Sequence, residues 1–152
     1  MLTLFWDERG VILEHYMPRW NNVNSATYAD LLKKHLRPAI KSKRHGLLSI
    51  GVLLQHDNAL SPTARSTVAT IKDLSFECLP RPPYSPDLAP NDFHVFGPLK
   101  EAAGGKSFSS YESRRCMNGC TLSQNTFFSR GIHAFPKRWN IYMVRSGDYV
   151  EK

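Results

Sequence analysis

The sequence predicts an α/β fold in one domain of 152 residues, and two patterns carry this prediction. The first is a pair of apolar runs, Leu2–Trp6 and Val11–Tyr16, around the polar turn Asp7–Gly10, which is typical of a β-hairpin. The second is an apolar run at 50–54 and another at 76–79, with a short helical pattern between them. Strands separated by a helix favour an α/β layer, in which functional residues gather beyond the carboxyl ends of the strands.

A long helix is expected after the hairpin. Asn24 or Ser25 caps it, and apolar residues recur at helical spacing from Tyr28 to Ile40. Pro38 lies inside this pattern, so we expect a kink or an early end there. The run at 50–54 that follows is nearly continuous in apolar residues, as in a strand covered on both faces.

Proline dominates the next part of the chain. Six of the ten prolines lie within residues 80–98, so a helix can begin only after Pro90, and Gly104-Gly105 would end it. Residues 106–123 are polar and poorly periodic, which predicts a loop or a weak helix.

A helical pattern of aromatic residues resumes at Phe127 and is interrupted by Gly131 and Pro136. The helical spacing favours core packing of these aromatic rings over stacking on nucleic-acid bases. The better candidates for phosphate contact in this segment are its basic side chains, Arg130, Lys137 and Arg138.

The composition restricts the class of protein. The chain is 41% hydrophobic and 22% charged, which is typical of a globular domain. Twenty Lys and Arg against 13 Asp and Glu give a net charge of +7, which favours a polyanionic partner. No apolar run is long enough for a membrane span, the first residues do not form a signal peptide, and three cysteines point to a reducing compartment. A membrane protein, a secreted mini-domain and a coiled coil are therefore not expected.

The polar side of the long helix is strongly basic, with no acidic residue between Lys33 and His45. Two interpretations stay open, a solvated helix face and a stripe that contacts nucleic-acid phosphates. The candidate nucleic-acid-binding residues are Lys33, Lys34, Arg37, Lys41, Lys43 and Arg44.

Asp57 and Asp92 are the candidate catalytic and metal-binding residues. Asp57 follows the predicted strand at 50–54, Asp92 lies at a predicted helix start, and 34 residues separate them. Carboxylates from separate elements are the ligands that Mg²⁺ or Mn²⁺ need in two-metal phosphoryl transfer. The alternative is structural, with Asp92 as a helix cap and Asp57 as a turn residue.

The motifs around these aspartates resemble those of the Tc1/mariner transposases. His56-Asp57-Asn58-Ala59 is similar to one family block, and Pro82 to Phe96, which includes Tyr-Ser-Pro-Asp-Leu-Ala-Pro, is similar to the next. The spacing of 34 residues is that of the mariner group, and the resemblance covers nearly the whole chain. It implies a partial RNase H-like catalytic domain over 1–152, with Asp57 as the second and Asp92 as the third carboxylate of a Mg²⁺- or Mn²⁺-dependent centre. Asp87 is structural in that pattern.

The resemblance also implies DNA as the partner and the nucleus as the location, with a second copy or an intact transposase as further partners. The family's first carboxylate lies in a Thr-Gly-Asp-Glu-like block, which these 152 residues do not contain. Asp7 is not its replacement, since it belongs to the hairpin turn. We therefore expect DNA binding at most, without transposition. We also expect a loosened or aggregation-prone chain, or direct pairing between the hairpin and the strand ending at Asp57.

Two departures from the family pattern and two alternatives complete the analysis. Leu60-Ser61-Pro62 replaces the usual Arg-Pro-His, and Cys116 and Cys120 form an isolated pair that is weak evidence for zinc. One alternative is a basic nucleic-acid-binding remnant, such as the tail of a SET-methyltransferase–mariner fusion. The other is a fragment that dimerises with intact transposase.

Overall fold

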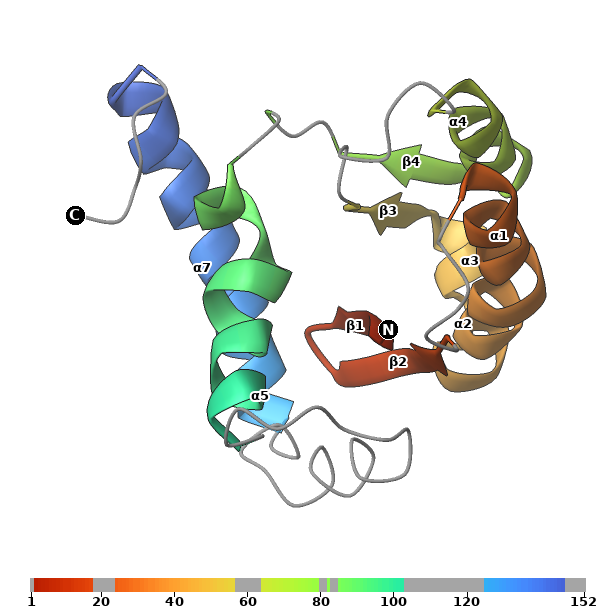
Figure 1. Ribbon diagram of the computed structural model, residues 1–152, viewed down its shortest axis with the longest axis horizontal. Coiled ribbons are helices and arrows are strands. Elements are labelled where there is room, and N and C mark those ends of the chain that lie inside the picture. The colour runs from red at the N-terminus through yellow and green to blue at the C-terminus, as the bar shows by residue number, and fades with distance from the viewer. Residues whose placement is uncertain are drawn as a thin grey trace. The chain divides into compact units, whose positions relative to one another are not determined.

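The computed structural model describes residues 2–17, 24–56, 64–79, 82, 85–102 and 125–146. The chain divides into two compact units. The first comprises Met1–Phe5 and Val11–Tyr84, and the second comprises Trp6–Gly10 and Ser85–Lys152. Figure 1 labels the elements of both units.

The predicted hairpin is confirmed, with strands β1 (Leu2–Asp7) and β2 (Gly10–Tyr16). In its turn the Arg9 backbone N–H donates to Asp7 Oδ1 at 2.9 Å, so Asp7 serves the turn as expected. Gly10 has a φ of +123°, a backbone conformation that residues other than glycine rarely adopt.

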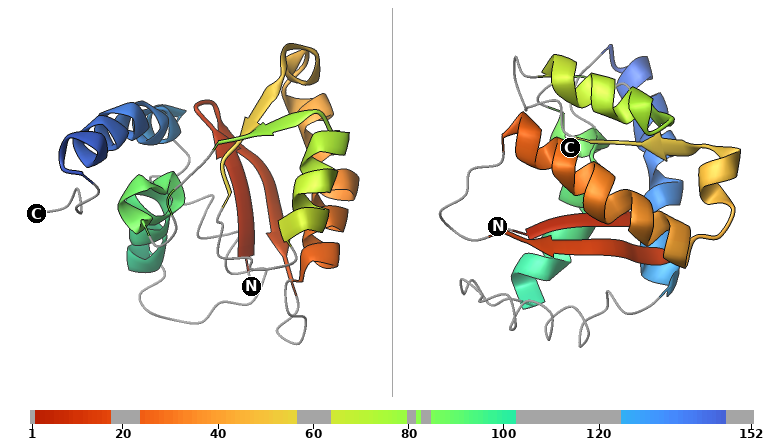
Figure 2. Two further views of the ribbon diagram at one scale, coloured as in Figure 1. Left: turned by 90° about the horizontal axis from the view of Figure 1, so that it is seen from above. Right: turned by 90° about the vertical axis from the view of Figure 1, so that its right-hand side faces the viewer.

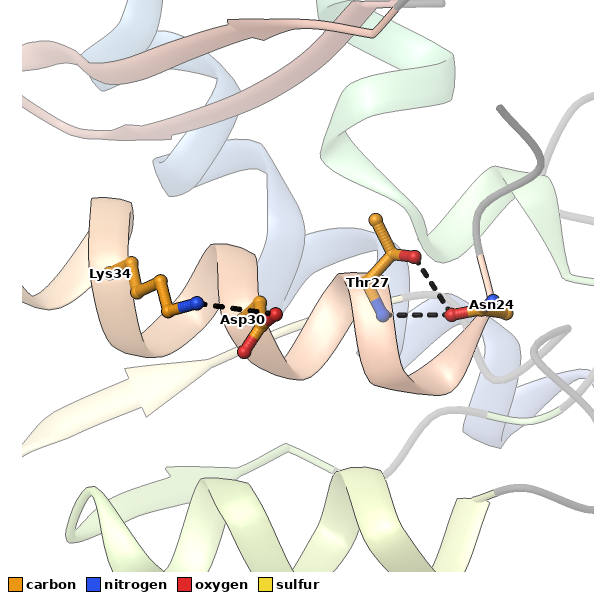
Figure 3. Close-up of polar contacts among 4 residues, drawn as sticks. All are labelled: Asn24, Thr27, Asp30 and Lys34. Atoms are coloured by element: carbon orange, nitrogen blue, oxygen red, sulfur yellow. Dashed lines mark hydrogen bonds and ion pairs between the residues drawn. The ribbon is translucent and has the colours of Figure 1, made fainter. Parts of the chain in front are cut away.

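The long helix begins at Ser25 and runs to Lys43 in three segments: α1 (Ser25–Asp30), the π-helical turn η1 (Leu31–Leu36) and α2 (Arg37–Lys43). Asn24 caps it, because its Oδ1 accepts from the Thr27 backbone N–H and from the Thr27 hydroxyl, both at 2.8 Å (Figure 3).

Pro38 does not end this helix, so the predicted early end is wrong. The Arg37 N–H donates to the Leu32 carbonyl, five residues back, so a wide turn directly precedes the proline. Because proline lacks an N–H and its ring crowds the preceding turn, a regular α-helical turn would be strained there. The wide turn is the distortion that accommodates the ring.

The predicted strand–helix–strand unit is confirmed as β3 (Val52–Leu54), α4 (Ala64–Asp73) and β4 (Phe76–Cys78). The two strands are parallel, with Val52 opposite Phe76. The short helix α3 (Leu47–Ile50) precedes β3.

Coverage of both faces of β3 is a wrong prediction. Val52 and Leu54 are buried, whereas Leu53 between them is 60% exposed. The reason is that α1, α2 and α4 all lie on one side of the strands (Figure 2), so only the side chains that face these helices are covered. Among the described strands, β1–β2 and β3–β4 form separate two-stranded sheets, so the expected direct pairing does not occur there.

The core of the first unit lies between these helices and the strands. Its members are apolar residues of β2, the long helix, β3, α4 and β4. They are Ile12, Tyr28, Leu31, Leu32, Leu36, Ile40, Val52, Leu54, Ile71, Leu74 and Phe76.

The second unit contains a 3₁₀ turn η2 (Pro86–Leu88), a π-helical turn η3 (Asn91–Val95), α5 (Phe96–Ala102) and α7 (Asn125–Val144). The helix after Pro90 is confirmed. The interruptions predicted in α7 are wrong, since the helix passes continuously through Gly131 and Pro136. Tertiary packing, described below for Gly131, outweighs the local cost of these residues.

The prediction for 106–123, the Cys116–Cys120 pair and the glycines at 104 and 105 all lie outside the described residues. Within the described part, no helix has the length and apolar character that crossing a membrane requires.

Candidate functional site

The carboxyl end of β3 leads directly into the first motif. After Leu54 the chain continues through Gln55 and His56, both half-buried, to Asp57, which lies outside the described residues. The His56 ring lies against Tyr28 of α1, with ring centroids 5.9 Å apart. Burial, and secondarily the nearby Cys78 thiol, hold the pKa of Tyr28 well above its usual value, so Tyr28 packs beside His56 in its neutral form.

Asp92 lies in the first turn of η3, and its side chain is exposed. Its backbone N–H donates to the Ala89 carbonyl at 2.9 Å, so the start of the turn is closed by the Leu-Ala-Pro part of the motif. Asp87 of the same motif is only 8% exposed, in agreement with its predicted structural role.

Neighbours of Asp92 along η3 are fixed from two sides. Trp6, at the hairpin end, donates from Nε1 to Asn91 Oδ1 at 2.5 Å. His94 donates from Nε2 to the Phe127 carbonyl of α7 at 2.6 Å and stacks on the Phe127 ring, with centroids 4.2 Å apart. The backbone that carries Asp92 is therefore held on both flanks by side-chain hydrogen bonds.

Gly131 allows α7 to approach this turn closely. A Cβ at Gly131 would lie 2.6 Å from His94 Cδ2, closer than side chains approach one another, and 3.0 Å from Trp6 Cη2, which is a tight contact. The approach also buries Phe128, whose ring centroid lies 5.4 Å from that of Trp6. Core packing, which the aromatic spacing predicts, is thus confirmed for Phe128.

Arg138 of α7 differs from its predicted role in phosphate contact. Its guanidinium carbon lies 4.1 Å from the centre of the Phe93 ring, and its Nη1 donates to the Asp87 carbonyl at 3.4 Å. A half-buried cation over an aromatic ring stabilises the packing of α7 on η3. Arg130 and Lys137 are exposed, as phosphate contact would require.

The predicted basic face is present on the long helix. Five of its six side chains are exposed and Arg44 is half-buried. Lys34 lies 3.5 Å from Asp30, one helical turn back, in an exposed ion pair (Figure 3). A pocket of about 660 Å³ opens between α2 and α3, and its basic lining residues are Lys33, Arg37, Lys41, Arg44 and His45.

The donor set predicted for a metal is chemically suitable, because Asp57 and Asp92 both supply the hard oxygen ligands that Mg²⁺ and Mn²⁺ prefer. Within the described ranges, no three His, Cys, Asp or Glu side chains gather closely enough to hold an ion. With Asp57 outside those ranges, the pairing of the two aspartates remains a prediction.

The sequence analysis did not identify the residues that hold the turn around Asp92. Trp6, His94 and Gly131 come from three distant segments, and no spacing in the sequence links them. The one available signal is a glycine in the middle of an aromatic helical pattern, which indicates a close approach rather than a break.

A family model, a sequence relative and several solved structures that match this chain are transposases. Residues 1–50 match the family described as "Transposase (partial DDE domain)". The chain is 36% identical to the mariner Mos1 transposase of Drosophila mauritiana over 99% of its own length, and 29% identical to the human histone-lysine N-methyltransferase SETMAR over the same share. It spans 45% of the first of these relatives and 22% of the second.

Solved structures give the same result for the fold. The catalytic domain of Mos1 transposase matches with a TM-score of 0.87 and 36% identity, over 99% of this chain and 76% of that one. The Mos1 paired-end complex with Mn matches with the same TM-score and 37% identity, over 99% of this chain and 44% of that one. The RNase H-like fold, the motif blocks and this coverage together show that the chain belongs to the mariner transposases and corresponds to part of their catalytic domain.

Proposed function

We propose that this chain supplies two carboxylates, Asp57 and Asp92, to a divalent-metal centre for DNA cleavage and strand transfer. The observation that carries the proposal is the held turn around Asp92, whose carboxylate is exposed while its neighbours Asn91 and His94 are fixed. A fixed backbone at Asp92 leaves only its side-chain rotamer to be ordered when a ligand binds, which favours a catalytic site. The Mos1 catalytic domain, solved with Mg and with Mn, supports the choice of ion.

The roles of the protein residues follow from their chemistry. A bound Mg²⁺ or Mn²⁺ would polarise a phosphodiester and lower the pKa of a water molecule. Asp57 and Asp92 would hold the ion through their oxygens, and Trp6 and His94 would keep the Asp92 backbone in place through Asn91 and the Phe127 carbonyl.

We further propose that these 152 residues by themselves bind DNA but do not transpose it. The resemblance implies a centre of three carboxylates, and the motifs present provide two of them. Support for DNA as the partner comes from the exposed basic face and from the Mos1 relatives solved in paired-end complexes. Such a role would place the protein in the nucleus, with a second copy or an intact transposase as its protein partner.

A second candidate function is a basic nucleic-acid-binding segment of a longer protein. The observations that favour it are the exposed basic face and the similarity to SETMAR, in which the matched part is 22% of the whole. Salt-dependent DNA binding that persists in Asp57→Ala would support this candidate. A third possibility, interference by dimerisation, predicts co-purification with a full-length relative.

The deciding experiment for the metal centre is a Mn²⁺ titration of the 152-residue chain, followed by calorimetry. Asp57→Ala and Asp92→Ala should each abolish saturable binding, because each removes one of the two carboxylates. Asp73→Ala is the matched control, since Asp73 is an exposed carboxylate at the end of α4. If the metal affinity of the two test variants equals that of Asp73→Ala, the proposed centre is refuted.

A further inference from the structure

The pocket between α2 and α3 has the composition of a phosphate-binding site. Four of its lining side chains are lysine or arginine, namely Lys33, Arg37, Lys41 and Arg44, and none of the described residues that line it is acidic. Its volume of about 660 Å³ is ample for the phosphate groups of a polymer.

Three consecutive parts of the chain supply these four side chains. Arg37 and Lys41 lie one turn apart in α2, whereas Lys33 comes from the preceding π-helical turn and Arg44 from the non-helical residue after α2, and all four line the same pocket. Gly46, with a φ of +84° in the left-handed region, then reverses the chain so that α3 forms the opposite wall. The pocket therefore depends on how α3 folds back beside the long helix, in addition to the basic residues of that helix.

The other two basic residues of the helix differ from these four. Lys34 is paired with Asp30 at 3.5 Å, and neither Lys34 nor Lys43 lines the pocket. The four clustered cations repel one another, since no acidic residue of the described part lines the pocket, and a polyanion relieves that repulsion. The structure thus divides the six predicted DNA-contact residues into a pocket set and a set outside it.

The pocket at α2 and α3 is separate from the carboxyl end of β3, where the proposed metal-binding motif begins. Tyr28, near the start of the long helix, contacts His56, which directly precedes Asp57. From Tyr28 the helix advances five residues to Lys33 and thirteen to Lys41, or roughly 8 and 20 Å at 1.5 Å per residue. Figure 2 shows β3 running back from α3 toward the start of α1, so the pocket and the carboxyl end of β3 are at opposite ends of this layer.

We propose that this pocket, between α2 and α3, binds backbone phosphates of duplex DNA. This inference rests on the proposed function and extends it to a defined second contact. The pocket holds and orients the duplex and takes no part in the chemistry.

The test compares charge-matched double variants of the 152-residue chain on a 24-base-pair duplex, with binding measured across salt concentrations. Arg37→Ala with Lys41→Ala removes two pocket cations. Two controls remove the same charge elsewhere: Lys34→Ala with Lys43→Ala on the same helix, and Arg65→Ala with Lys72→Ala, two exposed cations on α4. Far-UV dichroism confirms that each variant is folded.

Loss of two phosphate contacts should lower the slope of log K against log salt by about 1.8 and weaken binding about 30-fold at 0.15 M salt. Each control pair should lose less than about 5-fold, through general attraction alone. Equal losses in all three pairs would overturn the pocket while leaving DNA binding intact. Failure of the unsubstituted chain to bind the duplex would instead overturn the proposed function.

Discussion

Gly131→Ala tests whether the close approach of α7 holds the turn that carries Asp92. The added methyl group would lie 2.6 Å from His94 Cδ2, 3.0 Å from His94 Cγ and 3.0 Å from Trp6 Cη2. Rotation of either ring would break a hydrogen bond, that of His94 to the Phe127 carbonyl or that of Trp6 to Asn91. The methyl group is accommodated only if the His94 ring moves.

Three contributions give the size of the effect. Overpacking of a tight contact costs about 1–3 kcal/mol, and loss of the His94 hydrogen bond costs about 1 kcal/mol. The higher helix propensity of alanine returns about 1 kcal/mol. The variant should therefore be about 1–3 kcal/mol less stable, and each kcal/mol lowers the melting temperature by about 2–4 °C in a chain of this size.

Gly97→Ala is the matched control, because Gly97 lies within α5 and a Cβ there meets nothing within 4 Å. It should gain about 1 kcal/mol from helix propensity alone. Urea denaturation followed by dichroism measures both variants against the parent chain. Equal stabilisation by the two substitutions would refute the close packing of α7 on η3.

Three further predictions concern the first unit. Asn24→Ala removes the helix cap and should lower the free energy of unfolding, measured by urea denaturation, by about 1 kcal/mol. Asn24→Ser keeps an acceptor and should lower it less. Thr67→Val should stabilise the chain by about 1 kcal/mol, since within the described residues the buried Thr67 hydroxyl has no hydrogen-bond partner; a lower urea midpoint would contradict this. Burial, and secondarily His35 with its ring 4.9 Å away, lowers the pKa of His15 in the folded state. The unfolded state then binds more protons, so stability should fall as the pH drops through 6.5, and less steeply in His35→Gln; urea midpoints at pH 7.5, 6.5 and 5.5 measure this.

The elements that local chemistry determines are the ones that the sequence predicted well. The hairpin depends on a glycine-ended polar turn, the long helix on an asparagine cap, and the helix after Pro90 on the loss of backbone donors before it. At Pro38 the local pattern did not decide between a kink and an early end, and Gly131 was misjudged, for one common reason. Both act through neighbours that the local pattern does not reveal, a widened turn at Pro38 and the rings of His94 and Trp6 at Gly131.

The candidate site was predictable to the extent that it rests on linear motifs. Asp92 stands at a helix start with its side chain exposed, and the basic residues stand on one helix, as their spacing indicates. Arg138 could not be assigned, because its stacking on Phe93 depends on how α7 packs against η3. Likewise, the division between pocket cations and Lys34 depends on the reversal at Gly46.

Each π-helical turn, Leu31–Leu36 and Asn91–Val95, holds one residue more than an α-helical turn would, without changing the direction of the helix faces on either side. In a regular α-helix one extra residue rotates everything after it by about 100°. A single wide turn absorbs that residue, so the flanking faces keep their directions. A relative with one residue fewer in either turn would therefore present the same faces, and a helical wheel drawn across these turns would misassign them. Deletion of Lys34 should accordingly be tolerated better than deletion of Lys41, which has no wide turn to absorb it.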